Sequence, residues 1–93
     1  MRIKKDYRLR AVDEEYVVVP VGKAAKEFTG MIRLNSTAAL LWELLSDGAT
    51  EEDLVDDLIE EFDGEEGFTP DLARADVKAF VENLRAHNLL EEA

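Results

Sequence analysis

Apolar residues change their spacing near residue 35 of the chain. Before it they form runs rich in β-branched residues at Leu9–Val12 and Tyr16–Val21, with the acidic residues 13–15 between them. Two such runs joined by a short polar segment predict a β-hairpin. Pro20 has no N–H to donate, so we expect it late in its strand or where no ladder bond is needed.

A third short strand is predicted at residues 31–34, after a loop from Gly22 to Gly30. Alternation along a strand puts Ile32 and Leu34 on one face, and Met31 and Arg33 on the other. An antiparallel meander of three strands is the simplest arrangement. It leaves this third strand at an edge of the sheet.

Three helices are predicted after residue 35. Residues 38–45 are apolar nearly all round, as in a helix buried between other elements, with Asn35 or Ser36 as its N-cap. Residues 51–62 follow, with Thr50 as N-cap and acids in the first turn. Residues from Pro70 onward form the third helix, capped by Thr69, and Leu89-Leu90 pack after it. The predicted fold is α+β: a three-stranded antiparallel sheet followed by three helices.

Length and composition indicate one domain. The chain has 93 residues, 46% of them hydrophobic, which suits a single modest core. We expect residues 1–6 and 91–93 to be flexible. No cysteine is present, which excludes disulfides and thiolate sites. No signal peptide or membrane span is recognisable, so a cytoplasmic protein is expected.

The net charge of −11 argues against nucleic acid and anionic membranes as main partners. Every Lys and Arg after residue 34 falls on the third predicted helix, at positions 74, 78 and 85. At about 100° per residue these three lie within about 40° of one another. We call Arg74, Lys78 and Arg85 the basic stripe. It is either a solvated face or, with Val77 and Val81 as an apolar floor, one wall of a groove for an acidic amphipathic peptide.

Catalytic and metal-binding patterns are lacking. His87, the single histidine, stands near a helix end, where it suits the helix dipole better than it suits a general base. Asp63–Gly67 resembles a calcium loop only superficially, because Arg74 stands where the closing bidentate Glu would be needed. We therefore expect neither an enzyme nor a bound cofactor or metal.

The segment Gly30-Met-Ile-Arg-Leu-Asn35-Ser-Thr-Ala-Ala-Leu-Leu-Trp42 resembles the PqqD family. Further likeness lies in Leu45–Val55, in Asp76-Val77 with Phe80 and Leu84, and in the closing Leu89-Leu90. The resemblance covers roughly residues 7–91. The departures are a longer, more acidic linker at Asp63–Gly67, and Asn88 where a glycine often stands.

This resemblance implies a winged-helix-like, non-catalytic element that recognises ribosomally made precursor peptides. Such domains bind the leader of the precursor between the third strand and the third helix, and present it to a modifying enzyme, often a radical SAM protein. By position, the strand side of the groove would be Met31, Ile32, Arg33 and Leu34. The helix side would be Arg74, Val77, Lys78, Val81 and Arg85.

Two other functions stay open at this point. An acidic adaptor would dock an enzyme through Asp56, Asp57, Glu60 and Glu61 without a peptide groove, since such a cluster steers basic partners. A winged-helix nucleic-acid binder would have to use the basic stripe. The exposed edge strand also allows dimerisation by strand pairing, so we expect a monomer or a weak dimer.

Overall fold

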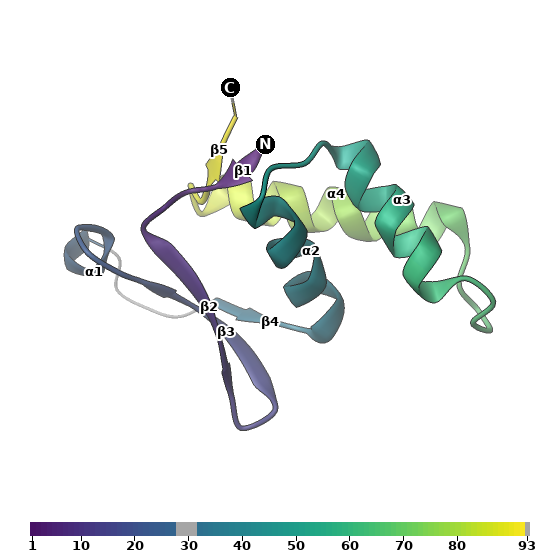
Figure 1. The fold of residues 1–93 in the computed structure, drawn as a ribbon, viewed down its shortest axis with the longest axis horizontal. Helices are drawn as coiled ribbons and strands as arrows, with labels where there is room; N and C mark the ends of the chain where they lie inside the picture. Colours follow the sequence, from purple (N-terminus) through teal and green to yellow (C-terminus); the bar gives the residue numbers. More distant parts are fainter. Residues whose placement is uncertain (28–31, 93) are drawn as a thin grey trace.

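The computed structural model describes residues 1–27 and 32–92 (Figure 1). Strands and helices follow one another in the order β1 (Arg2–Ile3), β2 (Tyr7–Val12), β3 (Glu15–Pro20), α1 (Ala24–Glu27), β4 (Ile32–Leu34), α2 (Ser36–Ser46), α3 (Glu51–Phe62), α4 (Pro70–Ala86) and β5 (Leu90–Glu91). The predicted fold class is confirmed: an antiparallel sheet of β2, β3 and β4 precedes the three long helices α2, α3 and α4. Three short elements, β1, α1 and β5, were not predicted.

The hairpin of β2 and β3 is joined by a two-residue turn. Asp13 and Glu14 both have positive φ, 48° and 69°, as a type I′ turn requires. Val12 pairs with Glu15 on either side of the turn. Glu15 is therefore the first residue of the second strand, whereas the sequence predicted it as the last residue of the turn. β4 pairs with β3 alone among the described residues, and the prediction that this strand lies at the edge is confirmed.

Local hydrogen bonds begin each long helix as predicted. The Asn35 side chain accepts a bond from the Ala38 amide at 2.8 Å and caps α2. Thr50 and Asp53 form a reciprocal capping box on α3. Thr69 caps α4, and Pro70 occupies the first turn. Each cap satisfies amide groups that have no partner inside the helix.

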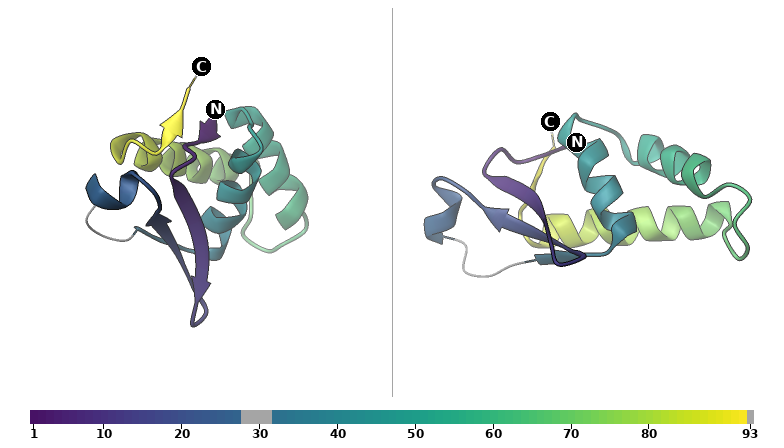
Figure 2. Two further views of the ribbon diagram at one scale, coloured as in Figure 1. Left: turned by 60° about the vertical axis from the view of Figure 1, so that its left-hand side comes forward. Right: turned by 60° about the horizontal axis from the view of Figure 1, so that its bottom comes forward.

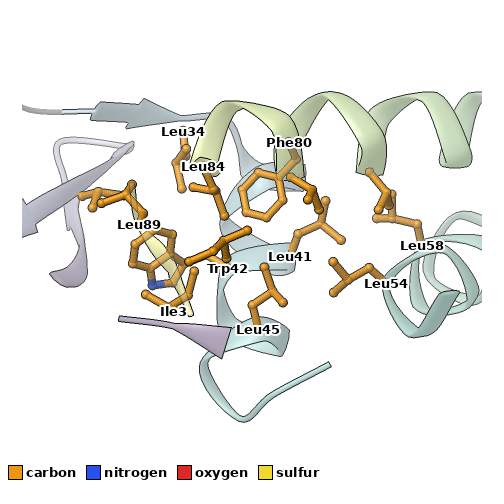
Figure 3. Close-up of a cluster of buried hydrophobic side chains, with 14 of the residues drawn as sticks. Ile3, Leu34, Leu41, Trp42, Leu45, Leu54, Leu58, Phe80, Leu84 and Leu89 are labelled. Atoms are coloured by element: carbon orange, nitrogen blue, oxygen red, sulfur yellow. The ribbon is translucent and has the colours of Figure 1, made fainter. Parts of the chain in front are cut away.

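One hydrophobic core joins the sheet to the helices (Figure 3). Trp42 on α2 lies beside Leu89 and Ile3, while Phe80 on α4 points toward α2. Leu54 and Leu58 on α3 are fully buried against α4. The almost uniformly apolar α2 is therefore covered on several sides, as its sequence indicated.

The two ends of the chain lie side by side (Figure 2). β1 pairs with β5 in a separate antiparallel sheet, in which Arg2 faces Glu91 and Ile3 faces Leu90. Ile3 and Leu90 are buried in the core, and the Ala49 amide donates to the Met1 carbonyl at 2.9 Å. We had expected flexible ends at residues 1–6 and 91–93. The structure instead pairs residues 2–3 with residues 90–91, because each end contributes an apolar side chain to the core.

Candidate functional site

A groove runs between the edge strand β4 and helix α4. Its volume is about 440 Å³. It opens where β4 passes along the C-terminal half of α4, with the two elements running in opposite directions (Figures 1 and 2). We call it the β4–α4 groove, and its lining residues are Arg33, Leu34, Asn35, Thr37, Ala38, Leu41, Asp76, Ala79, Phe80 and Asn83.

The strand wall of the groove presents unpaired backbone groups. The i to i+3 bond of the hairpin turn makes Val12 and Glu15 a hydrogen-bonded pair, and such pairs alternate along an antiparallel ladder. Val17 is then bonded to β2, and its neighbours Tyr16 and Val18 are bonded to β4. Arg33 lies opposite Val17, so its own N–H and C=O point to the open edge. A strand added at this edge would bond to Arg33.

The helix wall of the groove consists of one flank of α4. Asp76, Ala79 and Asn83 are exposed, while Phe80 is 7% exposed and forms part of the floor. The methyl group of Ala79 leaves room beside Phe80. This wall therefore combines a small apolar centre with a polar residue on either side.

Two charges of opposite sign face the β4–α4 groove. The Arg33 side chain is 71% exposed and reaches Glu15 only at 3.9 Å. Asp76 is exposed and forms no ion pair or hydrogen bond with the other side chains that the structure describes. Neither charge is tightly held, so both are available to a ligand.

The predicted strand residues lie where they were expected, as far as the structure describes them. Arg33 points outward and Leu34 is buried, with Ile32 half-buried on the same face as Leu34. Met31 lies outside the described residues. The backbone of β4, more than its apolar side chains, is therefore the accessible part of this wall.

Val77 and Val81 do not line the β4–α4 groove. Their exposed fractions are 1% and 0%, and both pack in the hydrophobic core. The apolar periodicity that predicted them as the floor of a groove instead marks the side of α4 that is buried against the other elements. Phe80 and Ala79 provide the apolar part of the groove in their place.

The basic stripe does not face β4 either. At about 100° per residue, its centre lies roughly 150° round the exposed side of α4 from the centre of Asp76, Ala79 and Asn83, and the buried face fills the rest of the circumference. Arg74 and Lys78 line a different hollow, between α3 and α4, together with Glu51, Glu52, Val55, Asp56 and the edge of Val77. Arg74 also lies 3.4 Å from Asp71. The structure thus separates these predicted cations from the predicted strand.

Arg85 is held at the other end of the stripe. Its Nε and Nη2 atoms donate to one carboxylate oxygen of Glu92, at 2.9 and 2.6 Å, and Glu51 lies 3.9 Å away. The hydrogen bond from Arg85 lowers the pKa of the Glu92 carboxyl, and the same bond raises the pKa of Arg85. This pair stabilises the chain end and lies outside the β4–α4 groove.

Sequence reasoning missed Asp76, Ala79, Phe80 and Asn83 as groove residues. Both flanks of the apolar face of α4 can be recognised in the sequence, but only the flank with three cations has a charge pattern that predicts a binding surface. The quieter flank carries exposed residues at positions 72, 76, 79 and 83, a spacing typical of one helix face. That spacing was the available signal.

The acidic residues on α3 that were predicted to dock an enzyme lie largely at the surface. Asp56, Glu60 and Glu61 are exposed and Asp57 is half-buried. Within residues 1–27 and 32–92, no group of three His, Asp or Glu side chains is arranged to hold a metal ion. No helix in the same ranges is long and apolar enough to cross a bilayer.

Comparison with solved structures supports the fold. The chain superposes on TbiB1, solved in complex with the TbiA(beta) leader peptide, with a TM-score of 0.74 and 22% identity, over 100% of this chain and 98% of that chain. A lasso peptide synthetase B1 complexed with the leader peptide gives a TM-score of 0.71 and 21% identity, over 98% and 96% of the two chains. At this level of identity the likeness establishes the fold alone.

Comparison with curated proteins gives no significant match. Comparison with family models gives a match over residues 15–90 to the family described as coenzyme PQQ synthesis protein D (PqqD). The matched segment runs from the start of β3 to the start of β5 and includes both walls of the β4–α4 groove. Since it covers most of the sequence, the chain belongs to the PqqD family.

Proposed function

We propose that this protein is a non-catalytic recognition element that binds the leader segment of a ribosomally made precursor peptide in the β4–α4 groove. The observation that carries the proposal is the open edge of β4, with the Arg33 backbone groups directed outward beside a hollow floored by Phe80. Membership of the PqqD family supports it. So does the likeness to two chains that were solved with leader peptides.

Strand addition explains how so small a groove binds a peptide. Main-chain hydrogen bonds to an exposed sheet edge supply affinity without demanding a particular sequence, and pockets for alternate side chains supply the selection. Each such bond contributes a net of about 0.5–1.5 kcal/mol. Burial of an apolar side chain against Phe80 and Ala79 adds to this through the hydrophobic effect.

The bound leader would be presented to a modifying enzyme, for which a radical SAM protein is our proposal. The acidic surface of α3, with Asp56, Asp57, Glu60 and Glu61, is the proposed docking face for that enzyme. Most of α3 lies away from β4, so an enzyme could bind there while the leader occupies the groove (Figure 1). This arrangement unites peptide capture with the adaptor role in one molecule.

Nucleic acid is a poor alternative for the basic stripe. Arg74 and Lys78 share their hollow with Glu51, Glu52 and Asp56, and Arg85 is bonded to Glu92. The stripe therefore offers little net positive charge to a phosphate backbone, and the protein carries a net charge of −11.

The test uses overlapping synthetic peptides of 15 residues that tile the short open reading frames beside the gene. Each is titrated into the isotope-labelled protein, and the amide resonances are followed. We expect one peptide to shift residues 32–35 and 76–83. Shifts confined to α3, or none with any peptide, would contradict the proposal.

A matched pair of variants then checks the site. Ala79→Trp fills the groove beside Phe80 and should weaken binding of that peptide at least tenfold. Ala75→Trp, one turn earlier on the same helix, is exposed and outside the groove lining, so it should leave affinity within about twofold. Equal affinities for the two variants would place the peptide elsewhere.

A further inference from the structure

The geometry of the β4–α4 groove restricts which leader it can take, provided that the groove binds a leader as proposed above. Side chains of an added strand alternate between the two faces of the sheet. Ile32 and Leu34 face the core and α4, while Arg33 points to the opposite face. The peptide residue directly opposite Arg33 therefore points to the Arg33 face, and both its neighbours point to α4.

The peptide residue opposite Arg33 would contact a guanidinium group that has no close ion-pair partner among the described residues. Directly opposed side chains on one face of antiparallel strands are close enough to interact, and opposite charges there are stabilising. The Arg33 side chain is 71% exposed, and its contact to Glu15 is at the outer limit of an ion pair. An acidic side chain suits this position.

The residues on either side of that acid meet α4. Ala79 and Phe80 favour an apolar side chain, because a small residue there leaves an apolar hollow. Asp76 stands at the end of the groove near Leu34 and Asn35, since α4 and β4 run in opposite directions. A basic side chain suits Asp76, whose carboxylate is exposed and not ion-paired within the described structure.

The direction of the added strand fixes the order of these charges. The sheet is antiparallel throughout, and antiparallel pairing is slightly more stable per residue than parallel pairing. An antiparallel peptide has its N-terminal part beside Leu34 and hence beside Asp76. Its base must precede its acid, and must do so by an odd number of positions, because the two point to opposite faces.

We propose that the β4–α4 groove selects leader strands in which an acidic residue, opposite Arg33, is flanked by apolar residues and preceded by a basic residue three positions earlier. Thr-Lys-Thr-Val-Glu-Val-Thr fits this pattern. Thr-Thr-Lys-Val-Glu-Val-Thr has the same composition but places its base and its acid on one face.

The experiment selects binders from a library of random twelve-residue peptides displayed on phage, using the wild-type protein and the variants Arg33→Glu and Asp76→Lys. The wild type should enrich the pattern above. Arg33→Glu should replace the acid by a base at the same position, and Asp76→Lys should replace the preceding base by an acid. Lys78→Glu, on the opposite flank of α4, is the matched charge-reversal control and should enrich the wild-type pattern.

Synthetic peptides then measure the size of the preference. The pattern peptide should bind about twofold to fivefold more tightly than its scrambled partner, because the partner keeps its acid opposite Arg33 and loses one exposed ion pair, the one with Asp76. Asp76→Lys should abolish or reverse that preference, whereas Arg33→Glu should weaken both peptides and leave the ratio within about twofold. Amide spectra verify that all variants keep the fold, which is expected because both side chains are exposed.

Failure of this inference and failure of the proposed function have different signatures. Peptides that shift β4 and α4 but share no acid, or have the base at an even spacing, would overturn the pattern and leave leader capture standing. Absence of any enriched peptide, or binders that shift only α3, would overturn both.

Discussion

Arg85 donates from both Nε and Nη2 to one carboxylate oxygen of Glu92, at 2.9 and 2.6 Å. The two residues join the last turn of α4 to the residue that follows β5. Since β5 pairs with β1, this contact helps to hold both ends of the chain against the helices. It also explains why Arg85 is not available to a peptide at β4.

Glu92→Gln should lower the free energy of unfolding slightly near neutral pH, because the charged partner of Arg85 is lost. Hydrogen bonding to Arg85 lowers the pKa of Glu92 in the folded state. The stabilisation is therefore present above the ordinary carboxyl pKa and is lost as the pH falls through the lowered one. Urea unfolding of both proteins from pH 7 to pH 3 should show a difference that shrinks with acidity. A constant difference would mean that the charge of Glu92 is not its cause.

The double variant Arg74→Glu with Lys78→Glu should bind a groove peptide as tightly as the wild type, within about twofold. Both residues lie on the α3 side of α4, on the flank opposite β4. Fluorescence anisotropy with a labelled tiling peptide provides the measurement, with Arg33→Glu as the variant that should lose affinity. Strong loss in the double variant would return the basic stripe to the peptide site.

Leu58→Ala should lower the free energy of unfolding by about 2–5 kcal/mol, the range for leucines truncated in a core. Leu58 is fully buried between α3 and α4. Leu72→Ala is the matched control at a side chain that is 47% exposed, and it should cost about 0.5 kcal/mol or less. Urea unfolding measures both, and similar losses would contradict the packing of α3 on α4.

The features that were predicted best from the sequence are those that depend only on residues close together in the chain. Asn35, Thr50 and Thr69 cap helices through contacts only three residues away, so their roles could be read directly. The outward position of Arg33 follows from simple alternation in a strand. These features need no knowledge of how distant segments meet.

Features that depend on distant segments were missed or misplaced. The pairing of Ile3 with Leu90 joins the two chain ends, and neither two-residue strand has a pattern of its own. On α4 the sequence defined a buried face and two flanks, but which flank meets β4 is decided by how α4 packs on α2 and the sheet. Val77 and Val81 were assigned to a groove because apolar periodicity cannot distinguish a core face from a binding face.

Asn35 connects the cap of α2 to the groove, so its substitution should affect both stability and binding. Asn35→Ala removes the bond to the Ala38 amide and should cost about 0.5–2 kcal/mol of stability. Because Asn35 also follows β4 and lines the groove, peptide affinity should fall as well. Asn35→Ser keeps an N-cap oxygen and should restore most of the stability. If Asn35→Ala left the urea midpoint unchanged, the cap would contribute nothing.

The protein should remain a monomer despite its open edge, because of Arg33. Two copies joined through β4 about a two-fold axis would exchange the outward N–H and C=O of Arg33, which places the two Arg33 side chains directly opposite each other. Like charges in that position are destabilising, and charged residues on edge strands commonly prevent such pairing.

Arg33→Thr removes the repulsion and should increase dimerisation. Arg33→Glu replaces it with another like-charge pair and should stay monomeric. Sedimentation equilibrium over a hundredfold range of concentration distinguishes the three proteins. Equal association of the Thr and Glu variants would show that charge at this position does not control pairing of the edge.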